Sequence, residues 1–181
     1  MRVVERPLEQ MLVLEPDAVA DDRGFFFESF SARDFEKETG IAEPFVQDNH
    51  SHSRNHVLRG LHYQVTRPQG KLVRVVNGEV FDVAVDLRRS SPTFGRWAGV
   101  RLSVDNRRQA WIPPGFAHGF LVLSDSADVV YKASDFYFPE YERTIRWDDS
   151  FLAIAWPSAV TPLLSAKDAA GKAWAEAELF A

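Results

Sequence analysis

The sequence predicts a single, mainly β domain whose short strands form a sandwich or barrel. From Phe45 to Trp147, runs of β-branched and aromatic residues alternate with Gly, Pro, Asn and Asp, which is typical of many strands joined by tight turns. The chain has 181 residues, of which 45% are hydrophobic and 26% charged. This length and composition suit one hydrophobic core. We therefore expect one domain over residues 1–181.

Two short helices are expected outside this β region. The segment from Ser31 to Gly40 predicts the first, with the glycine as its C-terminal stop. Near the C-terminus, Ser165-Ala-Lys-Asp168 has the form of an N-cap serine with an acidic residue at the third helical position. An alanine-rich stretch follows it. We expect a C-terminal helix to begin there.

One β-hairpin is expected at Asn77-Gly78. This dipeptide lies between two strand-like runs that begin at Lys71 and end at Asp86, and Asn-Gly favours a type I′ turn. In that register Lys71 lies diagonally beside Asp82 on one face. Both runs are apolar on both faces, so the pair should be buried. Buried charges are costly to desolvate, and we expect this pair to serve a functional site.

Composition and charge exclude several classes of protein. The net charge of −5 and the pI near 5.5 argue against nucleic-acid binding as the main task. The chain has no cysteine, which excludes disulfides, zinc–thiolate sites and thiol nucleophiles. No apolar run reaches about 18 residues, and we see no signal-peptide pattern. We expect a cytoplasmic protein that does not enter the membrane.

His62 is the first candidate for chemistry. In the run 59–64, strand alternation places it on one face with Gly60 and Gln64, and the glycine leaves open space beside the ring. With an ordinary pKa near 6.5, histidine is the natural general base at neutral pH when a neighbour holds its ring. The alternative is a structural histidine in a barrel wall.

A metal site is the competing use of the histidines. The pair His50-x-His52 has ligand-like spacing, but no carboxylate follows it at ligand spacing. On the central strand the corresponding pair is His62-x-Gln64, which lacks a second histidine. We therefore expect no metal site, with His50 and His52 on the surface or in a loop.

Two further segments carry suitable side chains. Tyr131 lies in a strand-like run where it shares a face with Val129, and its phenol can donate a proton or simply fill the core. The stretch Asp22-Arg23-Gly24-Phe-Phe-Phe-Glu28 combines an arginine for phosphate with aromatic rings for a flat base. The same residues are also typical of an edge strand with a solvated charge pair.

Taken in order, these motifs resemble the dTDP-4-dehydrorhamnose 3,5-epimerase family from end to end. The matching text is DxRGxFxE, Gln47-x-Asn49, LRGLHYQ, QGKLVRVVNGEVFDVAVDLR, SPTFGRW, WIPPGFAHGFLVLS, YK, and Tyr137-x-Pro-Glu with Glu142. The resemblance implies a cupin-like jelly-roll β-barrel with short helices near both ends. It also implies a substrate of thymidine diphosphate joined to a 4-keto-6-deoxyhexose, inverted at carbons 3 and 5 without cofactor or metal.

The resemblance also implies roles for particular residues. His62 would be the base, Asp168 would hold its imidazole, Tyr131 would return the proton, Lys71 would stabilise the enolate oxygen, and Asp82 would hold Lys71. The residues expected around the phosphates and sugar are Arg23, Gln47, Asn49, Arg59, His118 and Lys167. Those expected near the nucleoside are Glu28 and Glu142, with Phe26 and Tyr137 stacked on thymine.

Family members form homodimers in which strands cross between subunits, so part of the nucleotide site is expected from the partner chain. Three alternatives remain open at this stage. Relatives that invert carbon 3 alone share nearly all of the motifs. A non-catalytic jelly roll could hold the same ligand, and a metal-dependent cupin could use His50, His52, His62 or His118.

Overall fold

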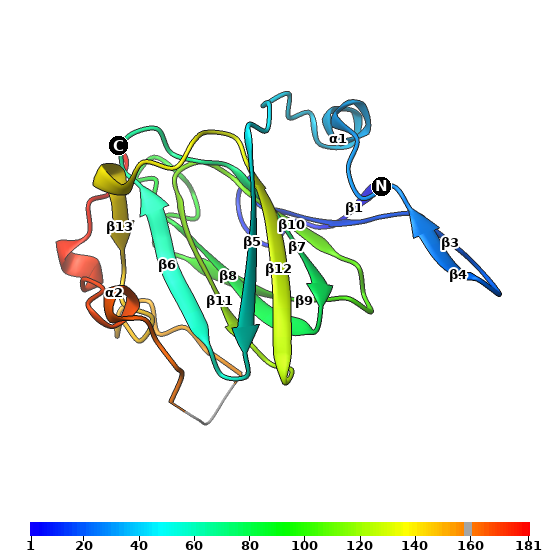
Figure 1. The fold of residues 1–181 in the computed structure, drawn as a ribbon. Helices are drawn as coiled ribbons and strands as arrows, with labels where there is room; N and C mark the ends of the chain where they lie inside the picture. The colour runs from blue at the N-terminus through cyan, green and yellow to red at the C-terminus, as the bar shows by residue number, and fades with distance from the viewer. Residues whose placement is uncertain (158–160) are drawn as a thin grey trace.

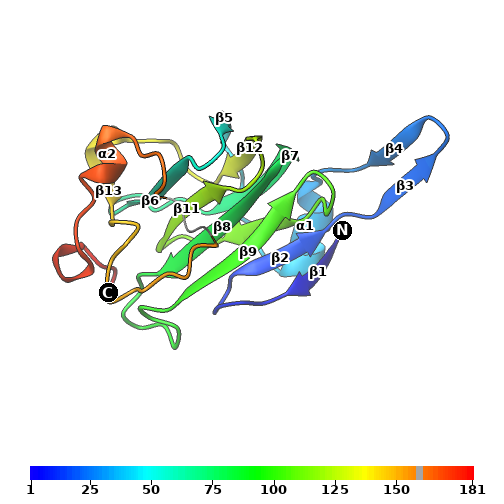
Figure 2. The same cartoon turned by 90° about the horizontal axis from the view of Figure 1, so that it is seen from below.

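Two antiparallel sheets form the body of the protein in the computed structural model, which describes residues 1–157 and 161–181. One sheet has six strands in the order β1-β2-β10-β7-β12-β5, and the other has five in the order β13-β6-β11-β8-β9. The sheets lie face to face, with the helices at the margins (Figures 1 and 2). This confirms the predicted mainly β, jelly-roll class with short helices near both ends.

The elements follow one another in this order: β1 (Arg2–Glu5), β2 (Leu12–Glu15), β3 (Ala18–Asp21), β4 (Gly24–Phe27), α1 (Ala32–Thr39), β5 (Gln47–Arg54), β6 (Leu58–Gln64), β7 (Lys71–Asn77), β8 (Glu79–Asp86), β9 (Trp97–Ser103), β10 (Gln109–Ile112), β11 (Phe116–Val122), β12 (Ser126–Ala133), the 3₁₀ turn η1 (Pro139–Tyr141), β13 (Glu142–Thr144), α2 (Ala166–Ala169) and the 3₁₀ turn η2 (Trp174–Glu176).

The main core fills the space between the two sheets. Alternate residues of each strand point inward, and they include Val73 and Val129 from one sheet and Val80, Ala84 and Phe120 from the other, all nearly or fully buried. Each buried Val, Leu or Phe side chain contributes about 1.5–3 kcal/mol relative to exposure. The core therefore holds the two sheets together and fixes which strand faces point inward.

Helix α1 occupies the predicted segment. The Ser31 hydroxyl accepts the Asp34 amide at 3.3 Å, and Gly40 ends the helix in the left-handed conformation with φ of 76°. Phe35 is 1% exposed and packs edge-on against Trp111, with ring centroids 5.6 Å apart. The cap signals and this one apolar anchor account for the short helix.

The C-terminal helix is much shorter than predicted. The Ser165 hydroxyl accepts the Asp168 amide at 3.1 Å, as expected of the cap, but α2 ends after one turn. Beyond it the Lys172 amide donates to the Thr144 carbonyl at 2.9 Å, and Gly171 lies against the backbone of Arg146. Pairing with the chain around β13 therefore overrides the helix propensity of the alanine-rich stretch.

The predicted hairpin at Asn77-Gly78 is wrong. Strand β7 pairs with β10 and β12 in one sheet, whereas β8 pairs with β9 and β11 in the other. The turn is tight, as Asn-Gly predicts, because Gly78 has φ of 76° and a Cβ there would lie 2.1 Å from the Ser126 carbonyl oxygen. It connects the two sheets, because both strands find longer-range partners.

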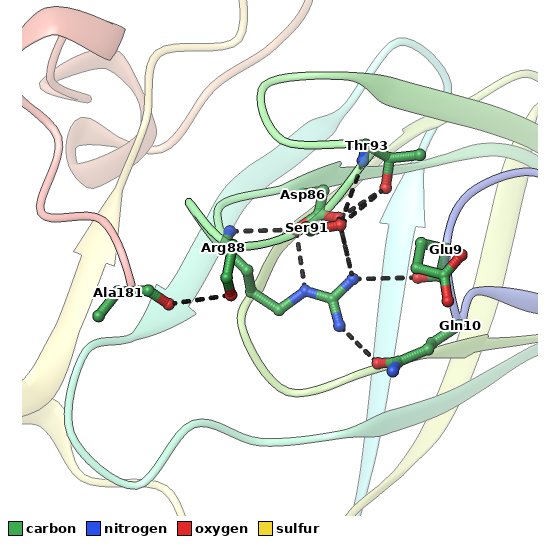
Figure 3. A network of polar contacts seen from close by, with 8 residues as sticks. Glu9, Gln10, Asp86, Arg88, Ser91, Thr93 and Ala181 are labelled. Atoms are coloured by element: carbon green, nitrogen blue, oxygen red, sulfur yellow. Dashed lines mark hydrogen bonds and ion pairs between the residues drawn. The ribbon is translucent and has the colours of Figure 1, made fainter.

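A buried polar network closes the turn at the end of β8 (Figure 3). Asp86 is fully buried, and Arg88 donates to both of its carboxylate oxygens at 2.9 Å, while the Ser91 and Thr93 hydroxyls donate at 2.5 and 2.7 Å. Burial raises the pKa of Asp86, but these hydrogen bonds outweigh it and hold the pKa below its ordinary value. Arg88 also donates to the Gln10 amide oxygen at 2.5 Å, which joins this turn to the N-terminal segment.

Strands β3 and β4 form a hairpin that projects from the body (Figures 1 and 2). Within the described ranges they pair with each other and with no further strand. Their side chains are largely exposed, including Val19 at 72% and Phe26 at 77%. None of the helices in the described residues is long and apolar enough to cross a membrane.

Candidate active site

A cavity of about 320 Å³ opens between the two sheets near β5, β6 and β12. Residues of both sheets line it, and most of them are polar: Gln47, Asn49, Ser51, Arg59, His62, Gln69, Lys71, His118, Gly119, Phe120, Tyr131, Tyr137, Glu142 and Lys167. A second hollow of about 290 Å³ includes Phe30, Leu72 and Val130. Tyr131 borders both hollows, but of these two only the first also contains His62 and Lys71.

His62 lies on β6 with a buried carboxylate behind it. Its Nε2 is 2.5 Å from Oδ1 of Asp168, which is 3% exposed. The Ser165 hydroxyl donates to the other carboxylate oxygen at 2.7 Å. Burial raises the pKa of Asp168, but hydrogen bonds from His62 and Ser165 outweigh this and keep it below its ordinary value. An ionised carboxylate only accepts hydrogen bonds, so Nε2 carries the proton and Nδ1 holds the free lone pair.

The His62 ring is poised as a neutral base. Burial lowers its pKa below 6.5, although the hydrogen bond and charge of Asp168 act in the opposite direction. The helix turn α2, which carries Asp168, lies beside β6 (Figure 1). The orientation of the imidazole therefore depends on a residue more than 100 positions away in the sequence.

Tyr131 lies on β12 in the opposite sheet. It is the register partner of Asn49 on β5 and of Val73 on β7, and with Val129 it packs against the main core, as strand alternation predicts. Burial raises the pKa of its phenol, and the carboxylate of Glu142 adds to this effect. The phenol is consequently protonated at neutral pH and can act as a proton donor.

Lys71 stands at the start of β7, and its half-buried side chain lines the cavity. Burial lowers its pKa to about 8, against the attraction of Glu142 and Asp82. The expected direct pair with Asp82 does not form: Oδ2 of Asp82 is 2.8 Å from Nε2 of His118, and its Oδ1 is buried without a hydrogen-bond partner among the described residues. Asp82 and His118 lie on neighbouring strands of one sheet, whereas Lys71 belongs to the other sheet.

Glu142 links two other residues of the cavity lining, Lys167 and Tyr137. Its carboxylate accepts from the Lys167 ammonium at 2.9 Å and from the Tyr137 hydroxyl at 2.9 Å. Burial raises the pKa of Glu142, yet these two hydrogen bonds hold it below the ordinary value. A cation and an aromatic ring are thus held together in the lining of the cavity.

The remaining predicted residues of the cavity form its β5 and β6 wall. Gln47 donates its side-chain amide to Asn49 at 3.0 Å and accepts the Tyr137 backbone amide at 3.0 Å. Arg59 donates from Nε to the Ser53 hydroxyl at 2.9 Å. Amides and a guanidinium therefore face the same space as His62, although strand alternation predicts Arg59 on the opposite face. The open space expected at Gly60 is also absent, because a Cβ there would lie 2.6 Å from the Cα of Gly119 on β11.

Three of the predicted binding residues lie outside this cavity. Arg23 stands at the tip of the β3–β4 hairpin, where it pairs with Asp21 at 2.5 Å, and its side chain is 90% exposed. Phe26 lies on the same hairpin, and Glu28 follows it directly. The fold of one chain does not bring this segment to its own His62.

Sequence reasoning missed one supporting residue and four lining residues, which are Ser51, Gln69, Gly119 and Phe120. Ser51 continues the alternation of Gln47 and Asn49 along β5, a period of two that could have identified it. Gln69 precedes β7 and donates to the Asp135 carbonyl at 2.7 Å, and no local signal distinguishes it. Ser165 was expected only as a helix cap, but its hydroxyl also binds the Asp168 carboxylate.

His50 and His52 are exposed on β5, and the neighbouring strand supplies a carboxylate that the local sequence lacks. Asp128 on β12 has Oδ1 3.0 Å from His50 Nε2 and Oδ2 3.2 Å from His52 Nδ1. In residues 1–157 and 161–181, no group of three or more His, Cys, Asp or Glu side chains is arranged to hold a metal ion.

A jelly roll whose cavity joins a carboxylate-backed histidine, a phenol and an ammonium defines a class of enzyme that moves protons on a bound small molecule. Comparison with known proteins identifies the family. The model of the dTDP-4-dehydrorhamnose 3,5-epimerase family matches residues 5–176. The chain belongs to this family, as its motifs predict, and is accordingly an enzyme of the isomerase class.

Individual relatives are similar over nearly the whole chain. A dTDP-4-dehydrorhamnose 3,5-epimerase of Pseudomonas aeruginosa is 57% identical over 99% of both chains. The crystal structure of a 3,5-epimerase from Legionella pneumophila, in complex with dTDP-4-keto-L-rhamnose, is 52% identical with a TM-score of 0.95, covering 98% of this chain and 94% of that one. A 3′-monoepimerase from Streptomyces bikiniensis, in complex with dTDP-quinovose, is 35% identical with a TM-score of 0.88, covering 97% and 88%.

Proposed function

We propose that the protein converts dTDP-4-dehydro-6-deoxy-D-glucose into dTDP-4-dehydro-L-rhamnose by inverting carbons 3 and 5 of the sugar. The observation that carries the proposal is the placement of a base and an acid on opposite walls of one cavity. His62, backed by Asp168, belongs to the five-stranded sheet, and Tyr131 belongs to the six-stranded sheet. A flat sugar ring held between them has one group on each face.

The first step is removal of a proton beside the ketone. Carbons 3 and 5 both flank carbon 4, so loss of either proton gives an enolate that the carbonyl stabilises. The Nδ1 lone pair of His62 accepts the proton, while Asp168 stabilises the imidazolium that forms. The ketone itself acidifies these protons, so the proposed reaction requires neither cofactor nor metal.

Lys71 stabilises the enolate oxygen in this scheme. Its ammonium lies at the cavity wall, where the charges of Glu142 and Asp82 favour the protonated form although neither carboxylate pairs with it directly. A preplaced cation in a water-poor site lowers the barrier most where negative charge develops. The role proposed for Asp82 changes accordingly: it fixes the ring of His118, which lines the same cavity.

The second step is reprotonation from the opposite face. Tyr131 is protonated at neutral pH because burial raises its pKa. Its phenol gives a proton to the enolate carbon on the face away from His62, which inverts the centre. Before the next round His62 releases its proton to solvent and the Tyr131 phenolate takes one up, and two such rounds, one at each carbon, complete the conversion.

Binding of the nucleotide uses the remaining polar residues. We assign Gln47, Asn49, Arg59 and Lys167 to the diphosphate and sugar, and Tyr137 and Glu142 to the nucleoside, in line with their common cavity. Arg23, Phe26 and Glu28 are assigned to the same ligand from the projecting hairpin of a second subunit. The enzyme is thus proposed to be a homodimer with shared sites, working in the cytoplasm.

Proton NMR of the reaction in heavy water tests the mechanism. The wild type should place deuterium at carbons 3 and 5 with inversion. Tyr131→Phe should still exchange a proton with solvent, because His62 can remove and return it on one face, but the original configuration should be retained. His62→Ala should bind dTDP and take up almost no deuterium, because it lacks the base.

Other outcomes lead to other conclusions. Inversion at close to the wild-type rate by Tyr131→Phe would make Tyr131 a core residue and assign the acid to another group. Deuterium at carbon 3 alone in the wild type would identify a monoepimerase. Binding of dTDP with no deuterium uptake at all would indicate a non-catalytic sugar-nucleotide binder.

A further inference from the structure

Side chains of one neighbouring segment contact the β3–β4 hairpin near its tip, at Phe25, and the chain just after it. The guanidinium carbon of Arg107 lies 4.8 Å from the centre of the Phe25 ring. Two residues further on, the buried side chain of Gln109 donates to the Ser29 carbonyl at 2.8 Å, just after the hairpin. The turn between β9 and β10 therefore holds the hairpin near its tip and the chain just after it.

The backbone of this turn is held rigidly. Arg107 has φ of 56°, an uncommon conformation for a residue other than glycine. The Asn106 side-chain oxygen accepts the Ser103 amide at 3.1 Å and the Arg108 amide at 2.9 Å, and its amide group donates to the Arg101 carbonyl at 2.9 Å. The surrounding hydrogen bonds thus fix the point from which the Arg107 side chain extends.

The Phe25 ring is the contact that orients the guanidinium of Arg107. Nε of Arg107 is buried and has no hydrogen-bond partner in the described part of the chain. Arginine stacks favourably on aromatic faces, and Phe25 is itself stacked on Phe27 with ring centroids 5.8 Å apart. Strand alternation places Phe26 on the other face of the hairpin.

We propose that Arg107 is a positioning residue for the nucleotide: by clamping Phe25, it sets the direction of the hairpin that presents Arg23 and Phe26 to the diphosphate and base. Arg107 does not touch the ligand in this proposal. Its cation covers one face of the hairpin and leaves the opposite face open for binding. The inference rests on the nucleotide-binding role proposed above for Arg23 and Phe26.

The test compares binding with catalysis. Arg107→Ala should weaken dTDP binding about three- to tenfold, the range expected when a partly exposed cation–π contact is lost. The KM for the sugar nucleotide should rise by a similar factor, while kcat at saturation and the pH profile of kcat stay unchanged. Calorimetric titration with dTDP and steady-state kinetics measure these quantities.

Matched variants make the result specific. Phe25→Leu should reproduce the effect, and the Arg107→Ala/Phe25→Leu double variant should lose no more than either single change. Arg107→Lys keeps the charge but not the planar group, so we expect a dTDP affinity between those of the wild type and Arg107→Ala. This variant separates loss of the stacking contact from a general folding defect. Arg101→Ala removes only a surface pair with Glu79 and should bind dTDP normally.

Phe26→Ala distinguishes failure of the clamp from failure of the nucleotide assignment. If Phe26→Ala weakens dTDP binding but Arg107→Ala and Phe25→Leu do not, the clamp is disproved and the proposed function stands. If Phe26→Ala leaves the affinity unchanged, both the hairpin's binding role and the clamp are disproved. A fall in kcat with unchanged KM in Arg107→Ala would also overturn the proposal.

Discussion

At the scale of single residues, the cavity contains two histidine–carboxylate pairs with different surroundings. His62 is partly open to the cavity and has its pKa lowered by burial, whereas His118 is nearly buried and bound to the fully buried Asp82. The open pair suits a base that must meet a carbon-bound proton. The closed pair suits a fixed hydrogen-bonding group that positions a ligand.

The pH dependence of kcat/KM should be bell-shaped, with one limb set by His62 and the other by Lys71. His62 must be neutral, so activity should rise with pH through a pKa below about 6.5, its ordinary value. Lys71 must be protonated, so activity should fall as pH rises through about 8. Steady-state kinetics from pH 5 to pH 10 would measure both limbs.

Two variants assign the limbs. Asp168 raises the His62 pKa, so Asp168→Asn should move the acid limb to lower pH while lowering the plateau rate. Lys71→Arg should move the basic limb upward, because arginine stays protonated. An unchanged acid limb in Asp168→Asn would return Asp168 to a structural role in the first turn of α2.

At the scale of elements, the turn after β8 depends on one carboxylate. Asp86 accepts hydrogen bonds from Arg88, Ser91 and Thr93, and Arg88 in turn contacts the N-terminal segment (Figure 3). Removing one partner of a buried ion pair leaves the other charge uncompensated. Loss of Asp86 alone should therefore destabilise this end of the sandwich more than loss of an exposed ion pair would.

Asp86→Asn should lower the free energy of unfolding by about 3–5 kcal/mol, the cost of an unpaired buried charge. Asp48→Asn is the control, because its pair with Lys132 is largely exposed and is expected to contribute about 1 kcal/mol or less. Urea unfolding at pH 7 and a fixed protein concentration measures both. Equal losses for the two variants would contradict a special role for the network.

The pH dependence of this stabilisation follows from the lowered pKa of Asp86. A carboxylate whose pKa is lower in the folded state stabilises the fold fully above its unfolded pKa. That contribution is lost as pH falls through the folded pKa. The difference between wild type and Asp86→Asn should accordingly shrink in acid.

At the scale of the whole molecule, the projecting hairpin and an open sheet edge suggest how two subunits meet. Strand β5 is the edge of the six-stranded sheet, and its Gln47 and Asn49 line the cavity. Edge strands need cover, and a two-stranded hairpin can supply it. We expect a homodimer in which each hairpin reaches the partner's cavity.

A mixed-subunit experiment tests this expectation. His62→Ala has an intact hairpin and a damaged cavity, and Arg23→Ala/Phe26→Ala has the reverse. The mixture as a whole should regain about a quarter of wild-type activity, because half of random dimers are mixed and each of these has one intact site out of two. His62→Ala mixed with Lys71→Ala should regain none, since both changes damage cavities. A monomer in sedimentation at micromolar concentration, or no recovery in the first mixture, would contradict the expectation.

The sequence by itself determined the features that depend on local pattern and motif. Strand alternation, the Ser31 and Gly40 caps and the Ser165 cap indicated the class and its short helices. The ordered motifs identified the family, and the strand face of Tyr131 followed from a period of two. These predictions agree with the structure because each depends on residues that are neighbours along the chain. Along β6 the period of two failed, because Arg59 and His62 line the same cavity and the pairing with β11 shifts register there.

The tertiary structure alone decided which distant partners meet. A local Asn-Gly signal predicts a turn but cannot tell whether the flanking strands pair with each other, so the Lys71–Asp82 contact was wrong and His118 was missed as the partner. The length of the C-terminal helix, the carboxylate between His50 and His52, and the Arg107–Phe25 contact have the same origin. Each depends on long-range packing, whose free energy outweighs local preference and leaves no mark in the sequence around it.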